Sequence, residues 1–164
     1  MKQLVAVTVV TLIIVFIGST YAKPIAVTNL SAGDSIKNYR LISPTGNVME
    51  SDSLTYPLLI SVFTTWCKVC KTELKHLDEG YHQLKKDKKS FSIIAVDAGE
   101  SQKSIRRYIR RRNLQLPVYV DTKLTFIKDL TILGTPTVLI FDKNKKLIFQ
   151  GNDLPQKWKE MLIQ

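Results

Sequence analysis

Hydrophobic and polar positions along the chain predict short buried strands that alternate with amphipathic helices. Two nearly continuous apolar runs, PLLISVF at residues 57–63 and FSIIAVD at residues 91–97, are typical of strands whose two faces are both covered. Between them, apolar side chains recur every three or four residues over residues 67–86, which predicts an amphipathic helix. The order of these elements predicts an α/β fold with a central mixed sheet flanked by helices.

The rest of the chain predicts one hairpin before this core and another after it. A Pro-Thr-Gly-Asn turn separates two short apolar segments within residues 39–49, and Lys143-Asn144 separates TPTVLIFD from KLIFQG. The second hairpin supplies antiparallel strands at the edge of the sheet. Four further elements are expected: a helix at 101–113 that begins at a capping serine, a strand at 117–121, and helices at 122–130 and 153–163.

The first 22 residues differ from the rest of the chain. Lys2 precedes a stretch without charge, and its apolar part, residues 4–17, has the length of a signal-peptide h-region. A membrane-spanning helix needs about 20 residues, which the whole stretch almost reaches. We therefore expect residues 1–22 to be a signal peptide or an N-terminal membrane anchor rather than a core helix, residues 23–37 a linker, and residues 38–164 the domain. Either leader sends the domain out of the cytosol, where a cysteine pair can stay oxidised.

Composition and charge narrow the choice of partners. A hydrophobic content of 45% in 164 residues can fill one core without support from disulfides. The formal net charge is +10, and the cations gather at residues 85–89, 106–112 and 143–146. No nucleic-acid-binding motif accompanies them, and an exported protein rarely meets nucleic acid. We therefore expect no nucleic-acid partner, and a solvated basic face that lies near anionic lipid or an acidic partner.

The two cysteines of the chain lie in TTWCKVC, between a predicted strand and the helix that follows it. Cys67 stands where the free N–H groups and the dipole of a helix N-terminus favour negative charge, so the pKa of its thiol falls. Lys68 adds positive charge beside it. Cys70, one turn later, is close enough to attack a mixed disulfide formed on Cys67. The segment therefore predicts a redox couple in which Cys67 attacks and Cys70 resolves.

Two other uses of the cysteine pair stay open. Cys67, Cys70, His76 and His82 are four candidate zinc ligands, but on one helix both histidines point away from Cys70 and from each other. Structural zinc sites normally use a longer gap between ligand pairs, so we expect no metal. The other use is an inert structural disulfide, although a bridge that closes so short a loop constrains the unfolded chain little.

Four stretches carry a resemblance to a known family. They are SVFTTWCKVCKTEL, the segment IIAVDAGESQKSIRRYIRRRNLQLPVYVD, LGTPTVLIFDKNKKLIFQG with its Gly-Thr-Pro-Thr loop, and the N-terminal hairpin. Together they cover residues 38–164 and resemble the thioredoxin fold, within it the ResA/TlpA-like branch of exported thiol–disulfide oxidoreductases, which includes reductants of cytochrome c maturation. The resemblance implies a thioredoxin fold with an added N-terminal β-hairpin.

The resemblance also assigns roles to single residues. It implies that Cys67 is the exposed nucleophile, that Cys70 is its buried partner in a Cys67–Cys70 disulfide, and that Trp66 shields the pair. Pro136 is expected to be cis and to pack against the disulfide, while the backbone of Thr135 offers hydrogen bonds to an extended substrate segment. The alternative is an ordinary trans proline that opens a strand.

Glu73 stands three residues after Cys70, where ResA-like members carry a glutamate under the active site. One helical turn from Cys70, its carboxylate can exchange a proton with that thiol. The alternative is a surface carboxylate paired with lysines. Ser61 occupies the position of the buried aspartate of thioredoxin and cannot act as a general base, so proton transfer falls to Glu73 or water. Glu100 is expected to line the cleft. The dipeptide Lys68-Val69 lacks the proline common in this branch and leaves the direction of electron flow open.

These inferences predict an exported thiol–disulfide oxidoreductase that reduces disulfides or Cys-x-x-Cys motifs of exported proteins, with apocytochrome c as the implied substrate. A membrane thiol donor is expected to re-reduce the couple. No organic cofactor or metal is implied. A monomer is expected in the periplasm, either soluble or anchored to the inner membrane. The alternatives are an oxidase or isomerase that gives its disulfide away, and a binding module that uses the groove beside Pro136 with an incidental disulfide.

Overall fold

The structure is a computed structural model that describes residues 27–87 and 90–163. The predicted leader, residues 1–22, and the first part of the predicted linker lie outside the described residues. None of the helices within the described ranges has the length and apolar character that crossing a bilayer requires.

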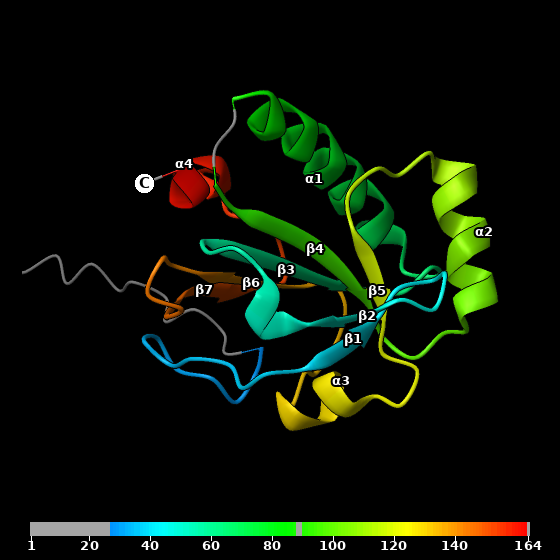
Figure 1. Ribbon diagram of the computed structural model, residues 1–164, viewed down its shortest axis with the longest axis horizontal. Helices are drawn as coiled ribbons and strands as arrows, with labels where there is room; N and C mark the ends of the chain where they lie inside the picture. The colour runs from blue at the N-terminus through cyan, green and yellow to red at the C-terminus, as the bar shows by residue number, and fades with distance from the viewer. Residues whose placement is uncertain (1–26, 88–89, 164) are drawn as a thin grey trace, which may run out of the picture.

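Seven strands form one mixed sheet in the order β2-β1-β5-β4-β3-β6-β7 (Figure 1). At its centre, β3 (Leu58–Phe63) and β4 (Ser92–Asp97) run parallel, and β5 (Val118–Val120) continues the parallel part beside β4. On the other side of β3, β6 (Thr137–Phe141) and β7 (Leu147–Gly151) are antiparallel. All six residues of β3 are buried, as the continuous apolar run predicts for a strand covered on both faces.

The N-terminal hairpin closes the opposite edge of the sheet. Its strands are β1 (Arg40–Ile42) and β2 (Val48–Glu50), and a short 3₁₀ turn, η1 (Ser51–Ser53), follows them. β1 joins the sheet through an antiparallel pairing of Ile42 with Val120. The predicted central mixed sheet with an added N-terminal hairpin is therefore confirmed.

Helices cover both faces of the sheet. On one face lie α1 (Lys68–Lys86), α2 (Gln102–Arg112) and α4 (Trp158–Ile163), and on the other lies α3 (Thr125–Asp129) (Figure 1). The side chains between the sheet and these helices form two buried hydrophobic clusters, one on each face. The predicted helix at 101–113 is α2, with Ser101 as its N-cap.

The last two helices are shorter than the sequence predicts. α3 begins at Thr125 because the side chain of Asp121 accepts hydrogen bonds from the backbone N–H groups of Thr125 and Ile127, at 2.9 and 3.0 Å. The segment before α4 contains Pro155, which disfavours helical backbone in the residue before it. The chain then forms a turn in which the N–H of Trp158 donates to the carbonyl oxygen of Pro155 at 3.0 Å, and α4 begins at Trp158.

The described part of the predicted linker, residues 27–37, packs against the domain. Thr28 is buried, and its N–H and hydroxyl groups both donate to the Gln150 side chain in β7, at 3.1 and 2.9 Å. The N–H of Asn29 donates to the carbonyl oxygen of Leu130, 3.0 Å away, at the end of α3. The folded body therefore extends at least as far as these residues, and the segment is blue in Figure 1.

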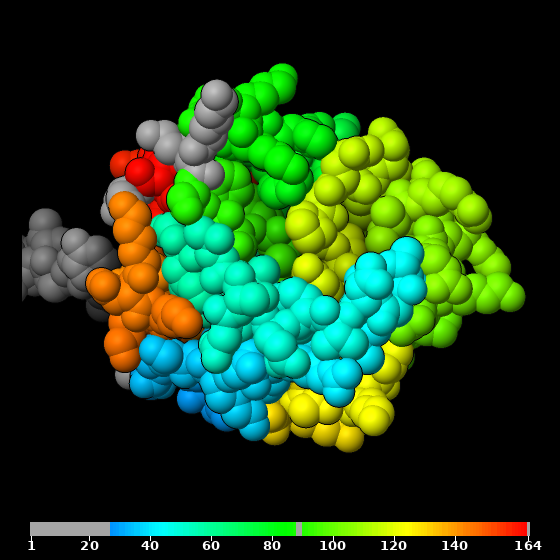
Figure 2. Space-filling view, viewed as in Figure 1, coloured from blue at the N-terminus to red at the C-terminus, as the bar shows by residue number. Residues whose placement is uncertain are grey.

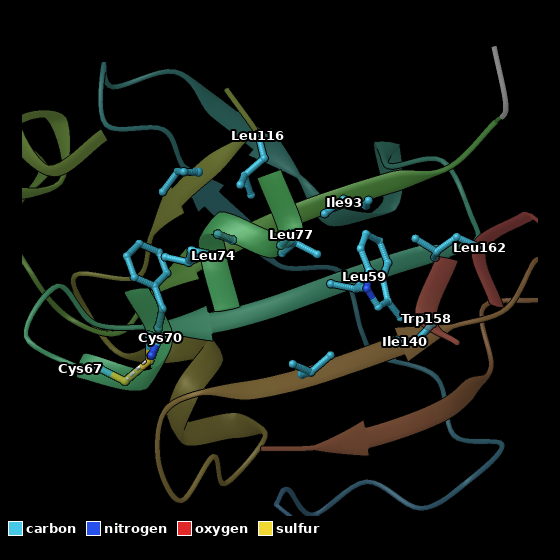
Figure 3. Close-up of a cluster of buried hydrophobic side chains, with 14 of the residues drawn as sticks. Leu59, Cys67, Cys70, Leu74, Leu77, Ile93, Leu116, Ile140, Trp158 and Leu162 are labelled. Carbon is cyan, nitrogen blue, oxygen red and sulfur yellow. Dashed lines mark hydrogen bonds between the residues drawn. A yellow bond between two sulfur atoms is a disulfide. The ribbon is translucent and has the colours of Figure 1, made fainter. Parts of the chain in front are cut away.

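α1 buries one side along its whole length, as its periodicity predicts. Its buried residues are Cys70, Glu73, Leu74, Leu77, Gly80 and Leu84. The cluster they join carries the cysteine pair at one end and the α4 residues Trp158 and Leu162 at the other (Figure 3). The helix therefore ties the cysteines to a rigid core.

Gly80 lets α4 approach α1, which makes an alanine there a test of this packing. A Cβ atom at Gly80 would overlap the indole ring of Trp158. On an exposed helix face, alanine is more favourable than glycine by about 1 kcal/mol. Here we expect Gly80→Ala to lower the free energy of unfolding by about 1 to 3 kcal/mol because the core is overpacked.

Denaturant unfolding followed by circular dichroism measures this change. His76→Ala, on the exposed side of the same helix, is the control and should change stability little. An alanine at Gly80 that raised stability would show that Trp158 can move aside at no cost.

Candidate active site

The site begins where β3 ends and α1 starts, at the carboxyl end of the central strand. Cys67 and Cys70 are joined by a disulfide, with their Cα atoms 5.3 Å apart. Cys67 is the N-cap of α1, and the backbone N–H of Cys70 donates to its sulfur at 3.1 Å. The first sulfur therefore occupies the end of the helix where unpaired N–H groups favour negative charge.

The two sulfurs differ in exposure. The exposed fraction of Cys67 is 8%, and Cys70 is fully buried. Cys67 is thus more covered than the resemblance implies, because its sulfur lies 3.7 Å from the carbonyl oxygen of Thr135 in the loop opposite. Solvent therefore reaches the disulfide at Cys67 and not at Cys70.

The loop opposite the disulfide contains the predicted cis-proline. The peptide bond between Thr135 and Pro136 is cis, and Pro136 is buried. The alternative of a trans proline is therefore wrong. The hydroxyl group of Thr137 donates to the carbonyl oxygen of Gly134 at 2.8 Å and closes the loop at its base. The carbonyl oxygen of Thr135 lies 3.7 Å from the Cys67 sulfur, and the expected binding of a substrate segment by the Thr135 backbone stays a prediction.

A mostly apolar hollow of about 240 Å³ adjoins this loop. Its lining residues are Thr64, Trp66, Ala98, Leu124, Ile127, Ile132, Leu133, Gly134 and Thr135. Trp66 and Leu133 are 74% and 78% exposed, so two large apolar side chains stand in solvent beside the disulfide. Whether Trp66 also shields the sulfurs stays a prediction.

Glu73 is buried on the inner side of α1, three residues after Cys70, rather than on the surface, so the alternative of a lysine-paired surface carboxylate is wrong. It is 7% exposed, and its Oε1 accepts a hydrogen bond from the hydroxyl group of Ser61 at 2.8 Å. Its Oε2 has no hydrogen-bond partner among the described residues. Burial raises the pKa of Glu73 to about 7, although the bond from Ser61 lowers it, and the charge of Asp153 raises it further.

A second buried carboxylate, Asp97, was missed by the sequence analysis. It ends β4 beside the end of β3 and is fully buried. Its Oδ2 accepts from the N–H of Glu100 at 2.7 Å, and its Oδ1 has no partner among the described residues. Burial raises the pKa of Asp97 to about 7; the bond from the Glu100 N–H lowers it, and the charges of Glu100 and Asp121 raise it. The position of an aspartate at the carboxyl end of a buried strand was the available signal.

Glu100 connects this carboxylate to the loop before the cysteines. Its two oxygens accept from the N–H and the hydroxyl group of Thr65, at 2.5 and 2.8 Å. The segment that leads into Cys67 is therefore fixed by a side chain from the neighbouring strand's loop. Glu100 lies beside the site, as expected, but its carboxylate is occupied by Thr65.

The candidate zinc ligands are not brought together. His76 and His82 are both exposed on α1. Within residues 27–87 and 90–163, no group of three or more His, Cys, Asp or Glu side chains could hold a metal ion.

The chain can be compared with known proteins. Residues 32–150 match the AhpC/TSA family. The chain belongs to the AhpC/TSA family. The matched range contains both cysteines, Glu73 and the cis-proline loop, so the candidate site lies inside the family domain. The family resemblance stated from the sequence is thereby confirmed.

Proteins named thiol-disulfide oxidoreductase ResA are similar to this AhpC/TSA-family chain. That of Bacillus thuringiensis subsp. konkukian is 29% identical over 107 residues, which cover 64% of this chain and 61% of that protein. That of Bacillus subtilis is 24% identical over 121 residues, which cover 73% of this chain and 66% of that protein. The chain thus spans less than two thirds of the length of these relatives.

Solved structures of similar fold include StoA from Bacillus subtilis and a putative thiol:disulfide interchange protein DsbE from Chlorobium tepidum. StoA has a TM-score of 0.65 at 18% identity, covering 78% of this chain and 98% of that chain. The DsbE-like structure has a TM-score of 0.67 at 23% identity, covering 80% and 92%. At these identities the likeness shows the fold, so the AhpC/TSA-family chain has the predicted thioredoxin fold.

Proposed function

We propose that this protein is a thiol–disulfide oxidoreductase that reduces disulfides of exported proteins. The observation that carries the proposal is the Cys67–Cys70 disulfide, which lies at the N-terminus of a helix with one buried side and adjoins the cis-proline loop. The names of the ResA relatives support the same reaction class. An inert staple would not require a helix N-terminus, an adjacent apolar hollow or a buried carboxylate beneath it.

The reaction begins with the reduced pair. The Cys67 thiolate, stabilised by the helix N-terminus, attacks one sulfur of a substrate disulfide, and the other substrate sulfur leaves as a thiolate that takes up a proton. Cys70 then loses its proton and attacks the Cys67 sulfur. The Cys67–Cys70 disulfide forms, the second substrate thiol is released, and two electrons have passed from the protein to the substrate.

Glu73 is positioned to take the proton of Cys70. It lies one helical turn from Cys70 on the buried side of α1, and its Oε2 is free of other partners among the described residues. A pKa of about 7 lets its carboxylate accept a proton at neutral pH and release it again. Ser61, which lies where thioredoxin has its aspartate, instead holds Glu73 in place through its hydroxyl group.

The proposal also includes a substrate, an electron donor, a cellular location and an oligomeric state. Apocytochrome c is the substrate that the resemblance implies, and a membrane dithiol is the donor that would return two electrons to the pair. An exported location, in the periplasm and either soluble or anchored through residues 1–22, would expose the pair to such substrates. The protein is proposed to act as a monomer without metal or organic cofactor.

The midpoint potential of the pair tests the direction of electron flow. Equilibration with glutathione or dithiothreitol buffers at pH 7 should give a value at or below the glutathione range of about −220 to −260 mV, as for a reductant. The reduced protein should also reduce insulin disulfides. A potential near about −120 mV, that of a strong oxidant, would instead assign the protein as a disulfide donor.

A further inference from the structure

α2 concentrates positive charge at one end of the molecule. Six of its eleven residues are cations and none is an acid: Lys103, Arg106, Arg107, Arg110, Arg111 and Arg112. None of the six forms an ion pair with a carboxylate in the part of the chain that the structure describes. The helix projects from the body in Figure 2, where it is yellow-green. Its charges are therefore available to a partner.

Helix stability does not explain all of these cations. The last turn of a helix favours positive charge, which accounts for the residues near the C-terminus, such as Arg111 and Arg112. Lys103 and Arg107 lie earlier and four residues apart, and like charges at that spacing destabilise a helix. The guanidinium group of Arg106 binds the carbonyl oxygen of Pro44 in the hairpin. Arg107 makes no comparable contact with the residues that the structure describes.

A cationic hollow of about 240 Å³ lies between α2 and the start of α1. Its lining residues are Thr65, Lys71, Glu100, Ser104, Arg107, Tyr108, Arg111 and Arg112. The hollow thus contains four cations and one carboxylate, and both oxygens of that carboxylate already accept from Thr65. The guanidinium group of Arg112 lies 5.8 Å from the centre of the Tyr108 ring. The hollow therefore has an excess of positive charge and free hydrogen-bond donors.

The hollow adjoins the reactive segment. Thr65 lines it, whereas Thr64 and Trp66 line the apolar hollow beside the cis-proline loop. The two hollows therefore flank the short segment that leads into Cys67. Lys71 stands four residues after Cys67, one turn into α1. An extended polypeptide advances about 3.3 Å per residue, so a substrate cysteine at Cys67 places residues only a few positions away at the cationic hollow.

We propose that the cationic hollow binds an acidic segment of the polypeptide substrate, a few residues from the cysteine that Cys67 attacks. The proposal rests on the proposed reductase function and adds the substrate class to it. Guanidinium groups bind carboxylates through paired hydrogen bonds, and the hydroxyl groups of Ser104 and Tyr108 add donors. A concave site next to the reacting sulfur fits a side chain of the substrate better than it fits a membrane surface.

Two model peptides test the proposal on the full chain. Each contains the same disulfide and the same apolar residues, but the residues on one side of the reactive cysteine are Asp and Glu in one peptide and Asn and Gln in the other. We expect the reduced protein to react about tenfold faster with the acidic peptide at low salt, and to lose this preference as ionic strength rises. The second-order rate constant for thiol oxidation measures the preference.

Two double variants of α2 distinguish an effect of the cationic hollow on the rate ratio from an effect of the total charge of the helix. Arg107→Gln/Arg111→Gln removes two cations from the hollow and should bring the ratio of the two rate constants close to one. Lys103→Gln/Arg110→Gln removes the same charge from exposed positions of the same helix that do not line the hollow, and should keep the ratio. Equal loss in both variants, or a wild-type ratio of one, would overturn the proposal.

Further measurements distinguish this proposal from the proposed function. If the wild type fails to reduce even 2-hydroxyethyl disulfide, the reductase function is wrong. Binding of the two peptides with Ser in place of Cys, measured by fluorescence anisotropy, then still tests the hollow, because the acidic peptide must bind more tightly and Arg107→Gln/Arg111→Gln must remove the difference. If Arg107→Gln/Arg111→Gln weakens only binding to phosphatidylglycerol vesicles and keeps the preference for the acidic peptide, the cations bind a membrane surface and the proposal is wrong.

Discussion

Replacing Cys67 with serine is expected to abolish turnover, whereas replacing Cys70 with serine is expected to leave the protein covalently bound to its substrate. Cys67 is the sulfur with solvent access and the one that accepts the N–H of Cys70 at the helix N-terminus. Without it, no thiolate is available to open a substrate disulfide, and reduction of insulin should fall by at least about a thousandfold. Without Cys70, the mixed disulfide on Cys67 has no internal attacker and accumulates.

Non-reducing electrophoresis and mass spectrometry detect the mixed disulfide, and dithiothreitol should release it. The two variants serve as controls for each other because both lack the internal disulfide, so a difference between them cannot come from the loss of that bond. If Cys67→Ser kept full function in the cell, the protein would be a binding module with an incidental disulfide. Substrates trapped by Cys70→Ser would also identify what the protein reduces.

Glu73→Gln is expected to slow reduction most strongly above pH 7. The wild-type carboxylate is ionised there and can accept the proton of Cys70, whereas the amide of glutamine cannot. The rate should fall by roughly a hundredfold above pH 7, and the two proteins should converge below it, where Glu73 is already protonated. The ratio of the two rates against pH reports Glu73 alone, because the ionisation of Cys67 affects both proteins.

The same substitution should change how stability depends on pH. Because the pKa of Glu73 rises from 4.5 to about 7 on folding, the folded protein keeps this proton to a higher pH than the unfolded chain does. The protonated Glu73 carboxyl stabilises the folded state fully below pH 4.5, and this stabilisation of about 3 kcal/mol is lost as the pH rises through about 7. In Glu73→Gln, the free energy of unfolding should not fall by this amount as the pH rises. The pKa of Asp97 is also about 7, so Asp97 should contribute equally to the pH dependence of stability in both proteins.

Denaturant unfolding at pH 4.5 and pH 8 measures this slope. Glu79→Gln, on the exposed side of the same helix, is the matched control and should retain the wild-type slope. An unchanged slope in Glu73→Gln would mean that folding does not raise the pKa of Glu73 above its ordinary value. Glu73 would then be a weaker base for the proton of Cys70 than proposed.

The sequence predicts those features of the fold that depend on local patterns. The apolar runs of β3 and β4 and the periodicity of α1 define the sheet and the helix that carries the cysteines. The Gly-Thr-Pro-Thr loop is recognisable through the family resemblance, because a proline before a buried strand fits a trans peptide bond equally well. α4 is shorter than the predicted helix at 153–163, because the predicted range contains Pro155 and the chain forms a turn there.

The environment of the carboxylates could not be read from the chain. From the residues alone, Glu73 fits a surface carboxylate among lysines as well as a buried acid, and the contact with Ser61 of β3, twelve residues away in sequence, decides between them. Asp97 becomes a buried acid only because β3 and β4 end side by side. The cationic hollow likewise exists only once α2 lies next to the start of α1. Contacts between distant segments decide these three features, and for Asp97 the local pattern gives only its position at the carboxyl end of a buried strand.

The packing of residues 27–37 sets a limit on how far the domain could travel from a bilayer. Should residues 1–22 be retained as an anchor, only residues 23–26 separate them from the packed chain. Four residues span at most about 14 Å even when fully stretched. A tethered enzyme would then scan only a thin layer next to the lipid headgroups, and its substrates and donor would have to come to that layer.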